Sequence, residues 1–142
     1  MLSEECRYAI KAMIFINSHK STRQKISLLE VVQAINSPIA FTAKILQQLR
    51  RHGLLKSAVG AQGGYWISSE KIISLKSIIE IIDGDEIFSK CILGLKSCTS
   101  LTPCPLHQNY MTIKDQFHSL MDKTYLDDYT EGLKSKKIKL KL

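Results

Sequence analysis

The chain has 142 residues, of which 44% are hydrophobic and 23% are charged, which is enough for one hydrophobic core and near the usual size of a single domain. Lys and Arg outnumber Asp and Glu by 20 to 13, and this net charge of +7 points to a polyanionic partner. The apolar stretch at residues 10–16 contains Lys11 and is too short to span a bilayer. We therefore expect a cytoplasmic protein with neither a membrane segment nor a signal peptide.

The aromatic fraction is only 7%, so Ile, Leu, Val, Met and Ala must build the core, and at helical spacing they favour an α-rich fold. Residues 6–17 form the first expected helix, whose apolar side consists of Cys6, Ala9, Ile10, Met13 and Ile16. A second helix is expected after Ser27, which forms a capping-box pair with Glu30. Its apolar positions follow at i, i+3, i+4 and i+7, namely Leu28, Val31, Val32 and Ile35.

The third expected helix follows a break at residues 36–38 and ends before Gly53, with Phe41, Ile45 and Leu49 recurring every four residues. Its predicted outer face is polar and basic and consists of Thr42, Ala43, Lys44, Gln47, Gln48, Arg50 and Arg51. Two helices joined by a brief turn, the second with outward-pointing donors, have the form that enters the major groove of DNA. The alternative is an ordinary surface helix, since any such helix has a polar face.

A hairpin is expected directly after this helix. Residues 54–59 and 65–68 have the pattern of two short strands, and the glycine-bearing residues 60–64 lie between them. Glycines allow a backbone to lie close to phosphates or to enter a minor groove, and Lys56 is available for a phosphate charge. This is the layout of a wing, and an ordinary surface hairpin is the alternative.

Two more helices are expected. Leu75, Ile78, Ile79 and Ile82 mark a short one that ends before Gly84. A longer one reaches about residue 127 and carries a narrow apolar seam of Leu106, Tyr110, Ile113, Phe117 and Leu120. We expect Tyr110, Ile113, Phe117 and Leu120 to form a homodimer interface, although the seam could instead dock on its own domain.

The four cysteines are unevenly distributed. Cys91, Cys98 and Cys104 lie within fourteen residues, whereas Cys6 stands alone on the apolar side of the first helix, where a thiol commonly acts as a small hydrophobe. A tight cluster without a secretory signal is more often a metal or redox site than a set of disulfides. With His107 the cluster offers three thiolates and an imidazole, a set suited to an iron-sulfur cluster, with a structural zinc or a metal-free thiol sensor as alternatives.

The expected fold is mainly α with a small β-hairpin wing, a winged helix-turn-helix followed by a long C-terminal dimerisation helix. Residues 1–84 form the DNA-binding domain, residues 85–105 the cysteine-bearing sensor loop, residues 106–127 the dimerisation helix and residues 128–142 a basic, disordered tail that contacts DNA non-specifically. No Walker loop, dinucleotide fingerprint or hydrolase elbow is present, and no acid or base adjoins a nucleophile in a recognisable motif. We therefore expect no enzymatic activity.

The order of these parts resembles a known family, the winged helix-turn-helix transcription regulators of the IscR/NsrR type, grouped as the Rrf family. The resemblance covers nearly the whole chain. It rests on residues 7–9 and 11–13, the run at 49–54, the wing residues 63–65 and the segment 79–84, and it continues to Cys91, Cys98, Cys104, Pro105 and His107.

The resemblance implies a dimer on a partly palindromic duplex DNA operator, with the third helix in the major groove and the wing at the minor groove. We expect a repressor, with an activator as the open alternative. Positions Ala40, Ala43 and Lys44 match its base-reading face. The expected DNA contacts are then Ala40, Thr42, Ala43, Lys44, Gln47, Arg50, Arg51, Lys56, Gly63, Gly64 and Tyr65. It also implies a cluster on the three cysteines whose fourth ligand is His107 or a carboxylate from the partner's first helix. The histidine favours a 2Fe-2S over a 4Fe-4S cluster.

The sequence departs from the family pattern in places. Val59 replaces a common wing arginine, residues 61–62 replace a Pro-Gly pair, and six residues rather than five separate the first two loop cysteines. Arg7 stands where an acidic ligand occurs, which leaves Glu5 or Glu4 as the carboxylate alternative. The expected function is a regulator controlled by an iron-sulfur cluster. The alternatives are the same regulator with a structural zinc, a thiol sensor or small-molecule sensing, and an iron-sulfur electron carrier, which would leave the basic helix-turn-helix unexplained.

Overall fold

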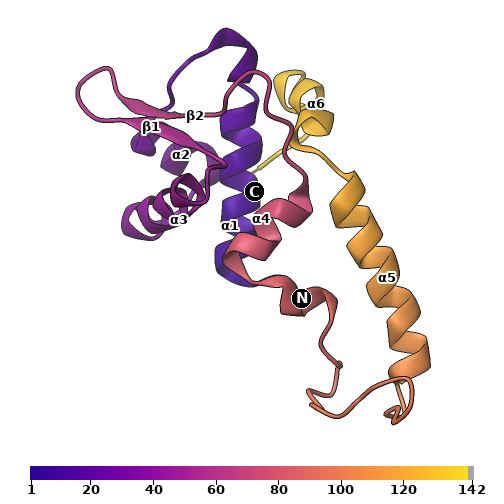
Figure 1. Ribbon diagram of the computed structural model, residues 1–142. Coiled ribbons are helices and arrows are strands. Elements are labelled where there is room, and N and C mark those ends of the chain that lie inside the picture. The colour runs from indigo at the N-terminus through magenta and orange to yellow at the C-terminus, as the bar shows by residue number, and fades with distance from the viewer. Residues whose placement is uncertain (141–142) are drawn as a thin grey trace.

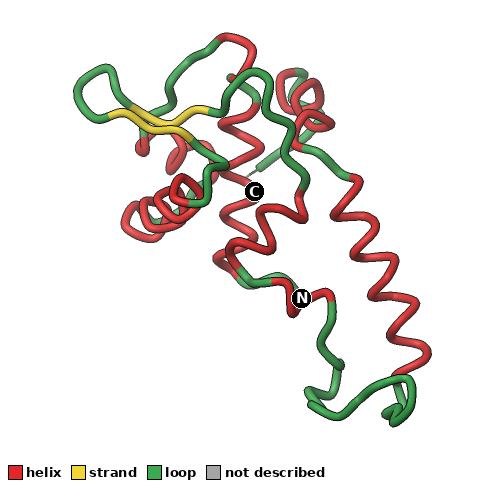
Figure 2. Tube along the Cα trace, in the orientation of Figure 1, coloured by secondary structure: helices red, strands yellow, loops and turns green. Residues whose placement is uncertain are grey.

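The computed structural model describes residues 1–140 and has a mainly helical fold with one small hairpin (Figure 1). The helices are α1 (Glu4–Asn17), α2 (Leu28–Ile35), α3 (Ile39–Arg51), α4 (Leu75–Ile82), α5 (His107–Lys123) and α6 (Thr130–Lys134). Short 3₁₀ turns are η1 (Lys20–Thr22), η2 (Asp85–Phe88) and η3 (Leu126–Tyr129), and the strands are β1 (Lys56–Ala58) and β2 (Gly64–Trp66). Figure 2 shows that loops make up most of the connection between α4 and α5. This arrangement confirms the predicted winged-helix fold.

Helix α1 is the central element of the core. Its buried residues include Ala9, Met13 and Ile16, and it packs against α2, α3 and α4. Leu126 of η3 is 1% exposed and joins the same core from the far end of the chain. The Leu126 N–H donates to Ile73 O at 3.0 Å, and the Leu75 N–H donates to Thr124 O at 2.9 Å. These bonds therefore fix the C-terminal end of the long helix α5 to the start of α4.

The helix-turn-helix is formed by α2 and α3, and its turn is held by local hydrogen bonds. The predicted capping box is confirmed: the Glu30 N–H donates to Ser27 Oγ at 3.2 Å, and the Ser27 N–H donates to Glu30 Oε2 at 2.7 Å. Asn36 ends α2 in the left-handed conformation, with φ of 52°, and Pro38 precedes the first turn of α3. The turn thus reverses the chain within three residues.

The wing is an antiparallel hairpin whose base is pinned to the rest of the domain. Lys56 pairs with Trp66, and Ala58 pairs with Gly64. Tyr65 and Ile26 exchange two backbone hydrogen bonds of 2.8 Å each. Gly64 has φ of +144°, and a Cβ there would lie 2.7 Å from Ile26 O, so only glycine permits this close approach. The strands are shorter than predicted because the backbone pairing begins only after Leu55, whose side chain is buried in the core.

The C-terminal segment differs from the predicted disordered tail. Residues 130–134 form α6, and Leu133 and Leu140 pack against the core. The Asn17 side-chain amide donates to Asp127 Oδ1 at 2.8 Å, and Lys20 forms an ion pair with the same carboxylate at 2.8 Å. The alternation of lysines with apolar residues has no helical or turn signature, but it allows the apolar side chains to dock on the domain. Lys141 and Leu142, the last residues of the predicted tail, lie outside the described residues.

None of the helices in residues 1–140 is both long and apolar enough to cross a membrane.

Candidate functional site

The outer face of α3 presents most of the predicted DNA contacts to solvent. Lys44, Gln47, Arg50 and Arg51 are exposed, as is Ala40, whereas Ala43 is half-buried. Figure 1 shows α3 and the hairpin at the same end of the molecule, away from α5. The fold therefore brings the donors of α3 and Lys56 of β1 to one end, and their contact with DNA remains a prediction.

Thr42 is a correction to the predicted outer face. Its side chain is 1% exposed, its hydroxyl donates to Pro38 O at 2.8 Å, and it therefore accepts the 2.6 Å hydrogen bond from the Ser37 hydroxyl. Thr42 precedes Ile45, Leu46 and Leu49 by three, four and seven residues, which places it on the buried side of the helix. Its hydroxyl therefore holds the turn between α2 and α3 and is not available to a base.

Lys44 forms an ion pair within the chain. Its ammonium lies 3.6 Å from Glu5 Oε1, and the two side chains are 68% and 28% exposed. Because an exposed ion pair of this kind is weak, Lys44 can leave Glu5 for a stronger acceptor. The sequence did not predict this pair, since the two residues are far apart along the chain.

The predicted DNA contacts in the wing also have roles in the fold itself. A Cβ on Gly63 would collide with the carbonyl oxygen of Ala58, and Gly64 lies against Ile26. Tyr65 is half-buried and packs against the core. These positions shape the hairpin, and a contact with DNA would be an additional role.

A basic hollow beneath the wing is a feature that the sequence interpretation missed. Arg23, Lys25 and Lys56 line it together with Trp66, and the Lys25 ammonium lies 5.1 Å from the centroid of the Trp66 ring. The sequence indicates only a polar break at residues 18–25, although the charges of that segment are visible in it. The basic surface next to the hairpin is therefore larger than Lys56 alone would provide.

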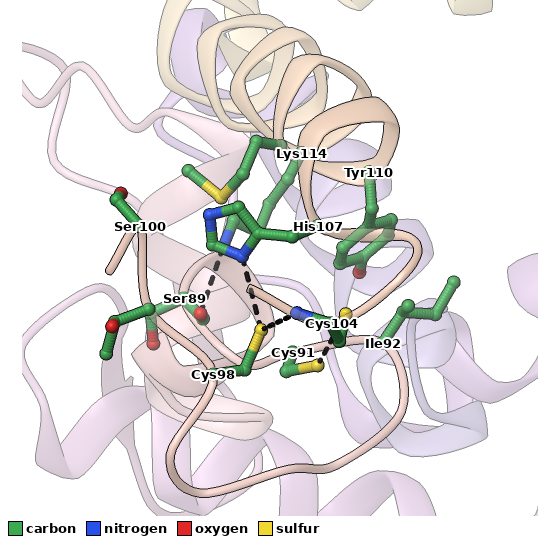
Figure 3. Close-up of a pocket in the computed structure, with 11 residues that line it drawn as sticks. Ser89, Cys91, Ile92, Cys98, Ser100, Cys104, His107, Tyr110 and Lys114 are labelled. Carbon is green, nitrogen blue, oxygen red and sulfur yellow. Dashed lines mark hydrogen bonds between the residues drawn. The ribbon is translucent and has the colours of Figure 1, made fainter. Parts of the chain in front are cut away.

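The three loop cysteines converge in the structure. Figure 3 shows their thiols facing one another, with His107 beside them at the start of α5. The three Sγ atoms all lie within 4.8 Å of one another. Cys91 Sγ lies 3.7 Å from Cys104 Sγ, and Cys98 Sγ lies 3.2 Å from His107 Nδ1. The loop thus gathers one nitrogen and three sulfur atoms, although its six-residue spacing departs from the family pattern.

The cysteine cavity, lined by these residues and by Lys114, has a volume of about 260 Å³. Lys114 is 9% exposed, and its ammonium donates to Ser89 O at 2.9 Å. A buried cation beside three thiols favours a negatively charged occupant. The volume lies below the roughly 300–1,000 Å³ of typical small-molecule sites, so a compact inorganic group fits better than an organic ligand.

The cysteine thiols differ in acidity. Backbone N–H donation from Leu95 is the main reason why the pKa of Cys91 falls to about 7. The Cys104 N–H donates to Cys98 Sγ, but desolvation and the two neighbouring thiols outweigh this bond and raise the pKa of Cys98. Burial, assisted by the nearby Asp83 carboxylate, raises the pKa of the distant Cys6 to about 12. The loop therefore contains a readily ionised thiol, whereas Cys6 is a buried, protonated one, as the sequence predicted.

The donor set fits a metal centre. All four cysteines are free thiols, and soft sulfur donors with one imidazole match the ligands of iron-sulfur clusters and of structural zinc. The site contains the four predicted ligands Cys91, Cys98, Cys104 and His107. Glu5 pairs with Lys44 and is not among the lining residues of the cavity in the same chain.

The apolar seam of α5 is divided between two environments. Leu106, Ile113 and Leu120 are 44%, 61% and 58% exposed. The ring of Phe117 instead stacks on Phe88 of η2 with 5.7 Å between centroids, and Tyr110 lies half-buried under the Lys114 ammonium. The seam therefore keeps an open apolar stripe on one side while its aromatic residues hold η2 and the cysteine cavity.

Known proteins resemble this chain over almost its full length. The family model named Rrf2 and described as "Iron-dependent Transcriptional regulator" matches residues 2–132. The HTH-type transcriptional regulator IscR of Vibrio atlanticus is 26% identical over 132 residues, covering 92% of this chain and 72% of the relative.

Solved structures have the same fold. CymR, the global cysteine regulator of B. subtilis, superposes with a TM-score of 0.77 at 26% identity, covering 92% of this chain and 96% of CymR. IscR of T. potens superposes with a TM-score of 0.73 at 22% identity, covering 97% of this chain and 91% of that protein. The family model and the Vibrio relative are described as transcriptional regulators rather than enzymes, in agreement with the predicted absence of catalysis.

Proposed function

Because the chain belongs to the Rrf2 family of transcriptional regulators, we propose that it is a homodimer that binds a partly palindromic DNA operator and responds to an iron-sulfur cluster on its cysteine loop. The observation that carries the cluster proposal is the convergence of three thiols and one imidazole on the cysteine cavity. The family match carries the DNA-binding proposal. Repression is the regulatory outcome that we propose.

Helix α3 is the proposed reader of the major groove. Lys44 and Gln47 are exposed on this helix and would supply donors for base edges, while the exposed Arg50 and Arg51 at its end and Lys56 on β1 would contact phosphates. Ala40 and Ala43 offer small apolar contacts on the same helix. Substitutions of these residues should therefore have two kinds of effect. Loss of a phosphate contact weakens binding to all DNA sequences, whereas loss of a base contact weakens binding to some sequences only.

A homodimer is proposed through the open stripe of α5. Three large apolar side chains exposed along one helix, at seven-residue intervals, are unusual unless a partner covers them. A twofold axis across α5 would repeat α3 in a second copy, and partly palindromic operators match such symmetry. Of the four expected interface residues, Ile113 and Leu120 stay in the proposed interface, and Leu106 joins them in place of the half-buried Tyr110 and Phe117.

The proposed cluster ligands are Cys91, Cys98, Cys104 and His107. A bound cluster would supply a redox-active and oxidation-sensitive centre on the side of the molecule away from the wing. Lys114 would offset its negative charge, and the cysteine cavity would limit solvent access. We favour a 2Fe-2S cluster because a histidine ligand accompanies cysteines in known two-iron centres.

Contacts within the chain link the cysteine loop to the DNA-reading helix. Lys114 of α5 holds Ser89, and Phe88 of η2 packs on Phe117. Helix α4 leads into η2, and its Ile81 carbonyl accepts a 2.9 Å hydrogen bond from the Gln48 amide of α3. A change in the loop can therefore act on α3 through α4. A coupling of about 1–3 kcal/mol, the usual range, would suffice for a regulatory switch.

The first experiment is anaerobic purification followed by visible spectroscopy and quantification of iron, sulfide and zinc on the same sample. We expect visible thiolate-to-iron absorption and equal iron and sulfide. Cys98→Ala and His107→Ala should reduce cluster content, whereas Cys6→Ala, which removes a thiol distant from the loop, should not. Zinc without colour would instead establish the structural-zinc alternative, and a metal-free protein after reconstitution would contradict both metal proposals.

DNA binding is tested separately on operator sequences selected from a random pool. Arg50→Ala and Arg51→Ala should weaken all sequences alike and lower the dependence of affinity on salt, whereas Lys44→Ala should alter sequence preference. Lys123→Ala, at the exposed end of α5, is the matched charge control. A sequence-selective loss in the arginine variants would contradict the phosphate assignment.

The coupling between the cluster and DNA binding is tested with Cys98→Ala. In wild type, operator affinity should differ before and after cluster reconstitution, and in Cys98→Ala this difference should be lost.

A further inference from the structure

A second cavity lies away from the cysteine loop, between the end of α1, helix α2 and the C-terminal segment. Its volume is about 610 Å³, within the roughly 300–1,000 Å³ of typical small-molecule sites. Its apolar walls come from Phe15, Ala34, Leu133, Ile138 and Leu140. In Figure 1 the segment that follows α6 runs back toward α1, which closes this side of the domain.

The rim of this cavity is cationic. Among the lining residues that the structure describes are Lys134, Lys136 and Lys139, and none of the described lining residues is acidic. Three ammonium groups around an apolar interior do not match a neutral hydrocarbon, which would leave their charge uncompensated. They match a ligand that buries an apolar chain and keeps an anionic group at the entrance.

The C-terminal wall is held by defined contacts. The N–H groups of Lys137 and Ile138 both donate to Gly132 O, at 2.9 and 3.0 Å. The Ile138 side chain lies where a Cβ on Gly132 would be, so a larger residue at position 132 would displace Ile138 from the wall. On the opposite wall the His19 ring stacks edge-on against Phe15, with 5.0 Å between centroids, and its Nδ1 lies 3.1 Å from the Phe15 carbonyl. Because a carbonyl only accepts, Nδ1 donates there, which fixes the orientation of the His19 ring in the wall.

We propose that this lysine-rimmed cavity binds an amphipathic organic anion, with an aliphatic chain against Phe15, Ala34 and Leu133 and a carboxylate among Lys134, Lys136 and Lys139. This site is separate from the proposed cluster site and from the α3 surface, and it involves neither metal nor DNA. Because the ligand would bridge α1, α2 and the C-terminal segment, binding stabilises the folded domain.

The test uses the full chain without DNA and compares three probes by isothermal titration calorimetry. Sodium decanoate, below its micelle concentration, should bind saturably with one molecule per chain and raise the Tm. Decanol has the same chain without the charge and should bind about threefold to tenfold more weakly, the range expected for partly exposed ion pairs. Butyrate has the charge without the chain and should show no saturable binding.

Two variants locate the site. Lys136→Gln combined with Lys139→Gln should weaken decanoate binding about threefold to tenfold and leave decanol unchanged. Lys96→Gln combined with Lys123→Gln removes the same charge at exposed positions outside the cavity and should have no effect. Ala34→Phe narrows the cavity at its apolar wall and should weaken binding of both ten-carbon probes.

The proposal is overturned if wild-type protein shows no saturable decanoate binding or if decanoate and decanol bind equally. It is also overturned if the two lysine double variants lose affinity to the same extent, since the effect would then be general charge attraction. If Ala34→Phe does not fold, the lysine variants still decide the question because their side chains are exposed. None of these outcomes depends on metal content or on operator binding.

Discussion

The helix-turn-helix half and the cysteine loop of this protein are organised by different interactions. Between α1 and α4 the core is continuous, with residues such as Met13, Leu49 and Ile78 fully buried. Between η2 and α5 only Cys104 is buried, and Leu101 is 94% exposed. Hydrophobic burial therefore specifies the first region, whereas the loop is arranged around its thiols, His107 and Lys114. The first region should fold without a metal, and the second is where a bound group has most to contribute.

The largest expected difference between the two regions is in thiol reactivity. In metal-free protein at neutral pH, iodoacetamide should modify Cys91 at least about two orders of magnitude faster than Cys6. The pKa values of about 7 and about 12 give Cys91 far more of the reactive thiolate, and the greater nucleophilicity of a thiolate of higher pKa offsets only about half of this advantage. Peptide mass spectrometry over time measures it, and all four cysteines should react in urea. Comparable labelling of Cys6 in the folded protein would show that its pocket opens readily.

The next largest effect is on the free energy of unfolding. Ile78→Ala removes a fully buried side chain and should lower stability by about 2–5 kcal/mol. Leu101→Ala, in the cysteine loop, should change it by less than about 0.5 kcal/mol. Urea denaturation of both variants measures the difference. A large loss at Leu101 would mean that the loop is packed against a second copy of the chain.

Two glycines, one in each region, differ in how tightly the backbone around them is packed. Gly64→Ala should lower the free energy of unfolding by about 1–3 kcal/mol, because alanine is strained at φ of +144° and its Cβ would contact Ile26 O. Gly94 in the loop has φ of +70°, and a methyl group there would meet nothing within 4 Å, so Gly94→Ala should cost about 1 kcal/mol. Thermal unfolding followed by circular dichroism tests the order of the two variants, and a reversed order would contradict the assignment of Gly64 as the pin of the wing.

The smallest expected effect on stability concerns the Asp127 carboxylate of η3, which Asn17 at the end of α1 and the nearby Lys20 contact. Burial alone would raise the pKa of Asp127, but hydrogen bonds from Lys20 and Asn17 outweigh it and hold that pKa below its usual value. Because the folded-state pKa is lowered, the stability from this carboxylate is present above its ordinary pKa and is lost as the pH falls through the lowered one. Asp127→Asn should lower stability at neutral pH by less than about 1 kcal/mol, since the pair is partly exposed.

Urea midpoints of wild type and Asp127→Asn, measured from neutral to acidic pH, test this assignment. The difference should shrink as the pH falls through the carboxyl range. A difference that grows toward acidic pH would have the wrong sign for a carboxylate stabilised by Lys20. Lys76→Gln, which removes the partner of Glu80 and Asp122 near the same end of α5, provides a control for a general change in surface charge.

Local sequence signals predicted most of the elements. The spacing of Leu28, Val31, Val32 and Ile35 and the capping residues around Ser27 placed α2 correctly, because caps and periodicity act within a few residues. The same reasoning wrongly assigned Thr42 to the outer face of α3, because its polar side chain was expected to point to solvent. Three buried positions further along α3 follow Thr42 at helical spacing, and the hydroxyl finds its partners within the turn.

The candidate metal site was predicted in composition but not in arrangement. Crowding of Cys91, Cys98 and Cys104 in the sequence indicated a metal or redox site, and Cys-Pro-Leu-His suggested the fourth donor. Nothing in the sequence showed that Lys114, ten residues after Cys104, reaches the same cavity, because one buried lysine on a helix has no local signature. The lysine-rimmed cavity was unpredictable for the same reason, since its walls come from both ends of the chain.

The helical periods, the caps, the glycine-bearing hairpin and the donor set of the cysteine loop could be predicted from the sequence, because each depends on residues close together along the chain. Three other features could not be predicted: the pairing of Glu5 with Lys44, the docking of the C-terminal segment on α1, and the division of α5 between inward-facing aromatic residues and the open Ile113 and Leu120. Each depends on packing between residues far apart in the chain, and such packing follows from the shape of the whole core rather than from any local pattern.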